Sequence, residues 1–152
     1  MTLKQFSILL ARISLFVIYF WFGLLKVIGQ SPASGMVTEL FEKTLGPMLA
    51  FVHMSFLSPE VFLVIFGIIE MLIGILILIP GKEKIAIVIF FAHMLTTSLP
   101  LFFLKASVWV HPFVPTLEGQ YIVKNLALIS CVIAIWEISP SRQRKEDSPV
   151  IQ

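Results

Sequence analysis

Four ionisable side chains interrupt long apolar stretches of this sequence: Arg12, Glu70, His93 and Lys124. Each lies inside a run of apolar residues long enough to cross the hydrocarbon core of a bilayer. A charged side chain at the centre of such a run costs roughly 2.5–3.5 kcal/mol on insertion scales, and more when it faces lipid. We therefore expect these side chains to face the interior of a helix bundle, where they could bind a polar ligand or move protons.

Glu70 is the residue around which the others are expected to gather. It lies near the middle of residues 59–79, a stretch that Ser58 and Pro59 start as helix N-cap and first position and that a Pro-Gly pair ends. Gly67 precedes Glu70 by three residues and Gly74 follows it by four, so both lie on its helix face. Small residues there allow a neighbouring helix to approach closely. Glu70 is therefore predicted to point into a helix interface.

The composition excludes an ordinary soluble domain. Of the 152 residues, 58% are hydrophobic and 13% are charged, and the mean hydropathy is +0.98. A single cysteine, Cys131, excludes a disulfide within the chain. The net charge is only +2, and the basic residues cluster beside the apolar runs, which indicates membrane topology rather than nucleic-acid binding.

The predicted fold class is an all-α membrane protein with four transmembrane helices in one domain, residues 1–138. The spans are predicted at residues 6–28, 59–79, 85–103 and 118–138. Between the first two, Met36–Leu45 alternates apolar and charged residues with helical spacing, which is typical of a short amphipathic helix at the membrane surface. Residues 139–152 form a polar tail. The distribution of lysine and arginine predicts that both termini are cytoplasmic, and that both long connections lie outside the inner membrane.

This topology assigns a depth to each ionisable group. At 1.5 Å per residue, Glu70 lies about 16 Å from the outer face and His93 about 12 Å from the inner face, and Arg12 and Lys124 each lie about 9 Å from a face. Each helix can therefore contribute one group to a shared interior. Two interpretations remain open: a structural cluster in which Glu70 pairs with Lys124 or Arg12, and a ligand or proton site. Lys124 is the favoured partner, because Gly119 allows span four to approach closely.

Further candidate site residues lie beside these four. Tyr19 and Lys26 share one helix stripe in span one, Thr97 follows His93 by about one turn, and Asn125 follows Lys124. For Tyr19 the alternative role is a core or interfacial aromatic, and for Lys26 it is a lysine that reaches out to the membrane surface. No metal site is predicted, because no second histidine lies three or four residues from His93.

Short motifs in all four spans resemble those of DoxX-like membrane proteins. Span one ends with a G-x-x-K formed by Gly23 and Lys26, and span two carries an E-x-x-x-G formed by Glu70 and Gly74. Span three has the threonine pair Thr96 and Thr97, and the second connection has Trp109. Span four opens with a G-x-x-x-x-K-[DN] formed by Gly119, Lys124 and Asn125. The last motif also resembles the reactive-chlorine resistance membrane family. Asn125 stands where an acid is common in the DoxX-like pattern.

This resemblance implies a four-helix inner-membrane protein, in families of which some members are linked to quinone reduction by thiosulfate or to oxidative stress. The first hypothesis is a small subunit or accessory of a membrane redox system that binds a quinone, a lipid or another lipophilic ligand in its polar interior. The sequence carries no flavin, haem or iron–sulfur motif, so such a role requires a redox partner protein. Two alternatives remain. One is a proton-coupled transporter or channel-like protein, for which alternating access would require a homo-oligomer, and the other is a structural or assembly factor for a membrane complex.

Overall fold

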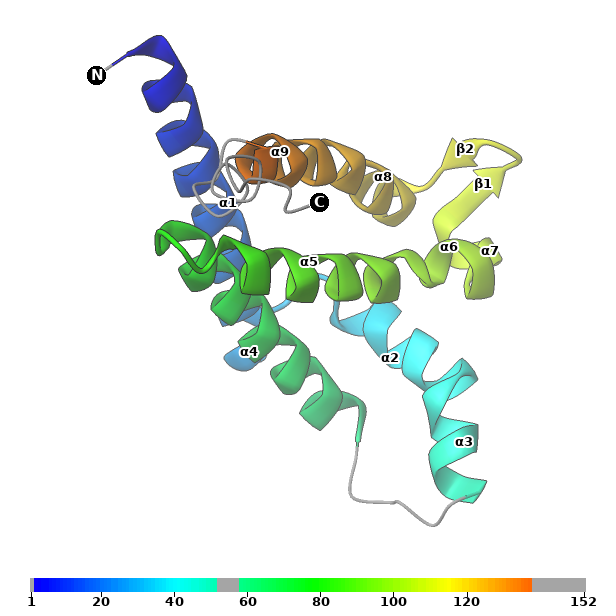
Figure 1. The fold of residues 1–152 in the computed structure, drawn as a ribbon. Helices are drawn as coiled ribbons and strands as arrows, with labels where there is room; N and C mark the ends of the chain where they lie inside the picture. The colour runs from blue at the N-terminus through cyan, green and yellow to red at the C-terminus, as the bar shows by residue number, and fades with distance from the viewer. Residues whose placement is uncertain (1, 52–57, 138–152) are drawn as a thin grey trace, which may run out of the picture.

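The computed structural model describes residues 2–51 and 58–137, which are almost entirely helical (Figure 1). The elements in chain order are α1 (Leu3–Val27), α2 (Ser34–Lys43), α3 (Leu45–Phe51), α4 (Pro59–Leu78), α5 (Glu83–Ser98), α6 (Pro100–Phe103), α7 (Lys105–Val108), β1 (Trp109–His111), β2 (Val114–Pro115), α8 (Leu117–Val123) and α9 (Asn125–Glu137). The tail predicted at residues 139–152 lies outside the described residues.

Four helical stretches are long and apolar enough to cross a membrane: Leu3–Val27, Pro59–Leu78, Glu83–Phe103 and Leu117–Glu137. This confirms the predicted all-α fold with four spans in a lipid bilayer. The first span starts earlier than predicted because Thr2 and Gln5 form a capping box. The Thr2 hydroxyl accepts from the Gln5 backbone N–H at 3.3 Å, and the Gln5 side chain accepts from the Thr2 N–H at 2.9 Å.

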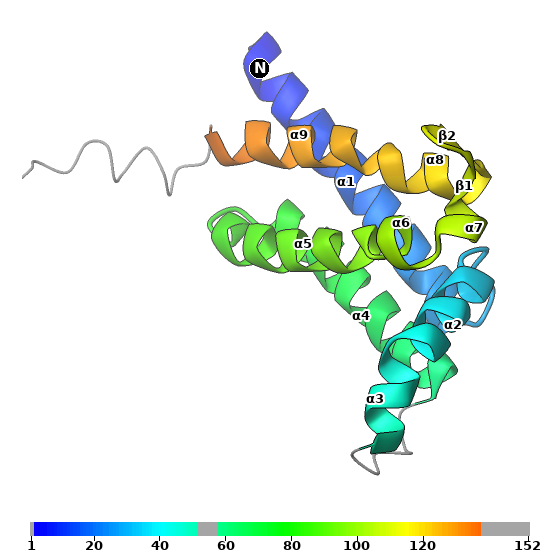
Figure 2. The same ribbon diagram turned by 90° about the vertical axis from the view of Figure 1, so that its right-hand side faces the viewer.

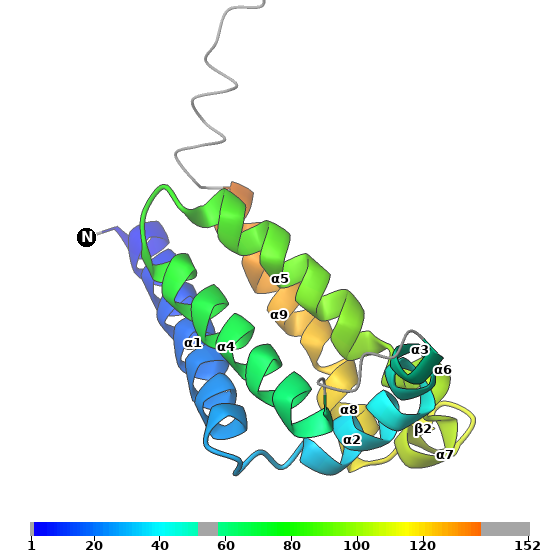
Figure 3. The ribbon, with the colours of Figure 1, turned by 90° about the horizontal axis from the view of Figure 1, so that it is seen from below.

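The four spans close into a ring in which α1 contacts α4, α4 contacts α5, α5 contacts α9, and α9 contacts α1. Helices α1 and α4 lie side by side over most of their length and form the most extensive contact (Figure 3). The central core of the bundle is apolar, with Leu15, Ile73, Ala86 and Phe90 almost completely buried. Large apolar side chains such as Trp21 are exposed on the outside of the ring, where a bilayer would cover them.

The short elements gather at one end of the bundle, which we call the loop end, and the N-terminus and the end of α9 lie at the other (Figure 3). Pro100 interrupts the third span: α5 ends at Ser98 and α6 begins at Pro100. The prolines in the connection from Lys105 to Thr116 favour an extended segment. Instead, the connection contains helix α7 and a two-stranded antiparallel hairpin, β1–β2, beside α6 (Figure 2). Phe113, at the hairpin turn, has a positive φ of 64°.

Helix α2 is the predicted amphipathic helix, and it packs on the loop end through its apolar face. Leu40 and Phe41 are buried, and the Phe41 ring lies 5.7 Å from the Phe62 ring of α4. On its polar face, Glu39 pairs with Lys43 at 2.5 Å and accepts a hydrogen bond from the Ser107 hydroxyl of α7 at 2.7 Å. The hydrogen bonds from Lys43 and then Ser107 lower the pKa of Glu39. This link between α2 and α7 is therefore retained until the pH falls below the usual range for a glutamate.

Candidate functional site

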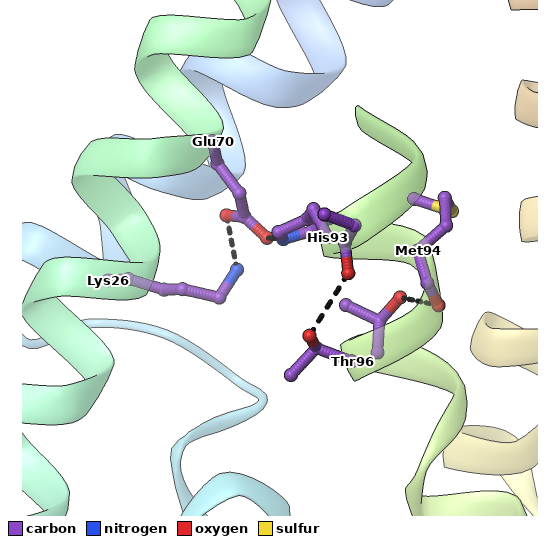
Figure 4. Close-up of polar contacts among 7 residues, drawn as sticks. Lys26, Glu70, His93, Met94 and Thr96 are labelled. Atoms are coloured by element: carbon purple, nitrogen blue, oxygen red, sulfur yellow. Dashed lines mark hydrogen bonds and ion pairs between the residues drawn. The ribbon is translucent and has the colours of Figure 1, made fainter. Parts of the chain in front are cut away.

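Glu70 lies at the centre of a buried polar network formed by three helices. One carboxylate oxygen accepts a hydrogen bond from the Lys26 ammonium of α1 at 2.6 Å, and the other lies 3.0 Å from Nε2 of His93 on α5. Figure 4 shows Lys26 and His93 both pointing toward the Glu70 carboxylate. The side chains of Lys26 and Glu70 are each only 8% exposed. Because an ionised carboxylate only accepts hydrogen bonds, Nε2 of His93 is the donor in this contact.

The prediction that Glu70 pairs with Lys124 or Arg12 is wrong, because it placed the ends of the helices at equal depth. Gly23 of α1 packs directly on Gly67 of α4: a Cβ atom added to Gly67 would lie 2.6 Å from the Gly23 carbonyl oxygen. Helix α1 ends four residues after Gly23, whereas α4 begins eight residues before Gly67. Helix α4 therefore extends about 6 Å further toward the loop end. This offset places Lys26 beside Glu70 instead of at the membrane surface.

Arg12 belongs to a separate ion pair near the opposite end of the bundle. Its guanidinium donates to the Glu83 carboxylate of α5 at 2.7 Å and to the Ile77 carbonyl oxygen of α4 at 2.7 Å. Ile77 is in the last turn of α4, where carbonyl oxygens lack partners within the helix, and an arginine commonly satisfies them. Arg12 thus joins three helices. Contrary to the prediction, it does not lie in a shared interior with Glu70. Sequence reasoning missed Glu83 as its partner because Glu83 reads as part of a polar turn.

A cavity of about 380 Å³ extends from the Glu70 network to the loop end. All the predicted site residues except Arg12 line it: Tyr19, Lys26, Glu70, His93, Thr97, Lys124 and Asn125. Most of its remaining wall is apolar or aromatic: Ile18, Phe22, Met36, Val37, Leu40, Phe62, Phe66, Met94, Leu117, Tyr121, Ile122 and Leu128. Cavities of this size and character, with a few convergent polar groups, are typical of small-molecule sites.

Phe62 and Phe66 of this wall were not predicted, although the sequence contains a signal for them. Phe62, Phe66 and Glu70 follow one another at intervals of four residues, so they share one face of α4. The Phe66 ring lies 4.5 Å from the His93 ring, and 5.5 Å from the Phe62 ring. A polar residue at the end of an aromatic stripe therefore marked the lining of the cavity.

A sequence model of the DoxX-like family matches residues 33–133. The chain belongs to the DoxX-like family. No match was found among curated proteins or among solved structures. The matched segment of this DoxX-like protein includes Glu70, His93 and Lys124, whereas Lys26 precedes it in α1. The family match therefore contains the carboxylate of the network, but not the lysine that pairs with it.

Two buried polar atoms at the cavity of this DoxX-like protein lack hydrogen-bond partners among the described residues: the Tyr19 hydroxyl and Nδ1 of His93. Their side chains lie next to each other, with ring centroids 5.6 Å apart. Buried hydroxyl and imidazole groups usually have a partner, because an unsatisfied one loses its hydration without compensation. A ligand oxygen seated against these residues would supply the partner that each lacks.

Proposed function

We propose that this DoxX-like protein binds a lipophilic ligand with a polar oxygen, such as a quinone, as a small subunit or accessory of a redox system in the inner membrane. The observation that carries the proposal is the cavity, in which the Lys26–Glu70–His93 network and the unsatisfied Tyr19 hydroxyl adjoin an apolar and aromatic wall. The apolar wall suits a ring or an acyl chain. The polar residues suit a carbonyl or hydroxyl oxygen, which prefers hydrogen-bond donors and acceptors.

The residues of the network are suited to holding and moving a proton beside such an oxygen. With Nε2 of His93 donating to Glu70, Nδ1 is an acceptor in the neutral ring and a donor in the protonated ring. Reduction of a quinone to a quinol takes up two electrons and two protons. In this proposal a redox partner protein supplies both electrons. The protonated His93 ring gives one proton to the quinone oxygen that it and Tyr19 contact, and solvent gives the second proton to the other quinone oxygen.

Replacing Tyr19 with phenylalanine tests the proposal. The substitution removes a buried hydroxyl that has no described partner, so the free protein should keep or slightly gain thermal stability. Affinity for a short-chain quinone should fall about 5–10-fold, because one hydrogen bond to the ligand oxygen is lost. Both quantities can be measured on the full chain in nanodiscs, by differential scanning fluorimetry and by quenching of tryptophan fluorescence.

The matched control is Trp21→Phe, an aromatic replacement on the outside of α1, where the side chain is exposed. It should change neither stability nor quinone affinity appreciably. Absence of saturable quinone binding by the unsubstituted protein would exclude the proposal, as would Tyr19→Phe that binds quinone as tightly as the unsubstituted protein.

A further inference from the structure

Lys124 brings a positive charge to the cavity that no described carboxylate balances. Its ammonium lies 3.9 Å from the centroid of the Tyr121 ring and 6.0 Å from that of the Phe22 ring, and all three residues line the cavity. Within residues 2–51 and 58–137, no aspartate or glutamate oxygen forms an ion pair with it. Aromatic faces attract a cation without neutralising it.

Two cations within α1 differ from Lys124 in that each forms an ion pair. Arg12 pairs with Glu83, and Lys26 pairs with Glu70, so each has a buried carboxylate as its partner. Cations within membrane spans generally have such a partner, because lipid does not stabilise an isolated charge. Lys124 has no such partner among the described residues: it is exposed, and it lines a cavity that is large enough for a ligand. The missing negative charge is therefore one that a ligand can bring.

Glu118 is the other acidic residue on the cavity wall besides Glu70. It lies in the first turn of α8, six residues before Lys124, which corresponds to about 9 Å along a helix. It is exposed at the loop end and forms no ion pair with Lys124 within the described residues. Glu118 therefore leaves the Lys124 ammonium open to an anion in the cavity.

We propose that Lys124 forms an anion subsite, and that the natural ligand is a lipophilic compound with a negatively charged oxygen group, such as a carboxylate, a phosphate or an ionised enol. This inference rests on the proposed function, because it assigns the ligand class of the same cavity. The neutral oxygen of the ligand contacts Tyr19 and His93, and its anionic group contacts Lys124. The aromatic rings of Phe22 and Tyr121 hold the ammonium in place for that contact.

Two naphthoquinones of nearly equal size test the subsite on the full chain in phosphatidylcholine nanodiscs. The first, 2-hydroxy-1,4-naphthoquinone, is an anion at neutral pH, whereas the second, 2-methyl-1,4-naphthoquinone, is neutral. The unsubstituted protein should bind the anion at least about tenfold more tightly, as expected for one charge-assisted hydrogen bond. Lys124→Met should lose this preference and keep its affinity for the neutral compound, which also shows that the variant is folded.

Two further variants complete the test. Lys124→Arg keeps the charge and should retain the preference for the anion. Lys105→Met removes an exposed lysine of α7 that does not line the cavity, and it should behave like the unsubstituted protein. Equal affinities of the unsubstituted protein for the two naphthoquinones would overturn the inference. A Lys124→Met variant whose affinities for both naphthoquinones are reduced equally would also overturn it.

Decanoate and decanol separate this inference from the proposed function, because neither is a quinone. Decanol is the neutral counterpart of decanoate. Binding of decanoate in preference to decanol that depends on Lys124, without binding of either naphthoquinone, would retain the anion subsite and reject the quinone. Decanoate binding that is unchanged in Lys124→Met would reject the subsite. Phosphatidylglycerol added to the nanodiscs identifies the source of the anion: competition with decanoate in the unsubstituted protein assigns a lipid headgroup, and no competition assigns a free lipophilic acid.

Discussion

Replacing Glu70 with glutamine is expected to destabilise the bundle by about 3–5 kcal/mol, because the substitution leaves the Lys26 ammonium buried without its counter-charge. The amide can still accept a hydrogen bond, but it does not neutralise the lysine. Lys26→Met should have an effect of similar size, since the Glu70 carboxylate would then have only the His93 ring beside it. The free energy of unfolding, measured by titration with SDS in mixed micelles, reports both effects.

The double variant decides whether the two residues act as a pair. Lys26→Met combined with Glu70→Gln should be much more stable than the sum of the two losses predicts, because no uncompensated charge remains. The matched control combines Lys124→Met with Glu70→Gln. Lys124 forms no ion pair with Glu70, so those two losses should simply add. Additive losses for Lys26 and Glu70 would contradict the pairing seen in the structure.

Gly67→Ala is expected to have the second large effect, because it separates the two most closely packed helices. The new Cβ atom would lie 2.6 Å from the Gly23 carbonyl oxygen and 2.8 Å from Cβ of Lys26. A backbone oxygen cannot rotate away, so α1 must shift as a whole. Overpacking of this kind costs about 1–3 kcal/mol, and here it also pulls Lys26 away from Glu70. The cost is measured by the same SDS titration.

Gly35→Ala is the matched control for this substitution. Gly35 lies in α2, and no heavy atom lies within 4 Å of a Cβ atom added there. Alanine has a higher helix propensity than glycine, by up to about 1 kcal/mol, so this variant should be as stable as the unsubstituted protein or more stable. If Gly67→Ala were tolerated as well as Gly35→Ala, the close contact between α1 and α4 would not exist in the membrane.

The number of spans, their type and most of their boundaries followed from the sequence. Hydrophobic runs of bilayer length determine a transmembrane helix locally, since each helix satisfies its own backbone hydrogen bonds. Local capping signals likewise determined where α4 begins at Pro59. The same local reasoning identified Glu70 as an interfacial residue. Glycines on its helix face allow a neighbouring helix to approach closely, and this holds for any of the other helices.

The partner of Glu70, by contrast, was decided only by the tertiary structure. Depth counted along each helix assumes that the spans begin in one plane, whereas the Gly23–Gly67 contact sets α1 and α4 out of register. With that offset Lys26 pairs with Glu70, and Arg12 pairs with Glu83. Lys124 instead lies on the cavity wall beside two aromatic rings. Relative shifts of helices depend on how their surfaces fit together, and this information is spread over residues far apart in the chain.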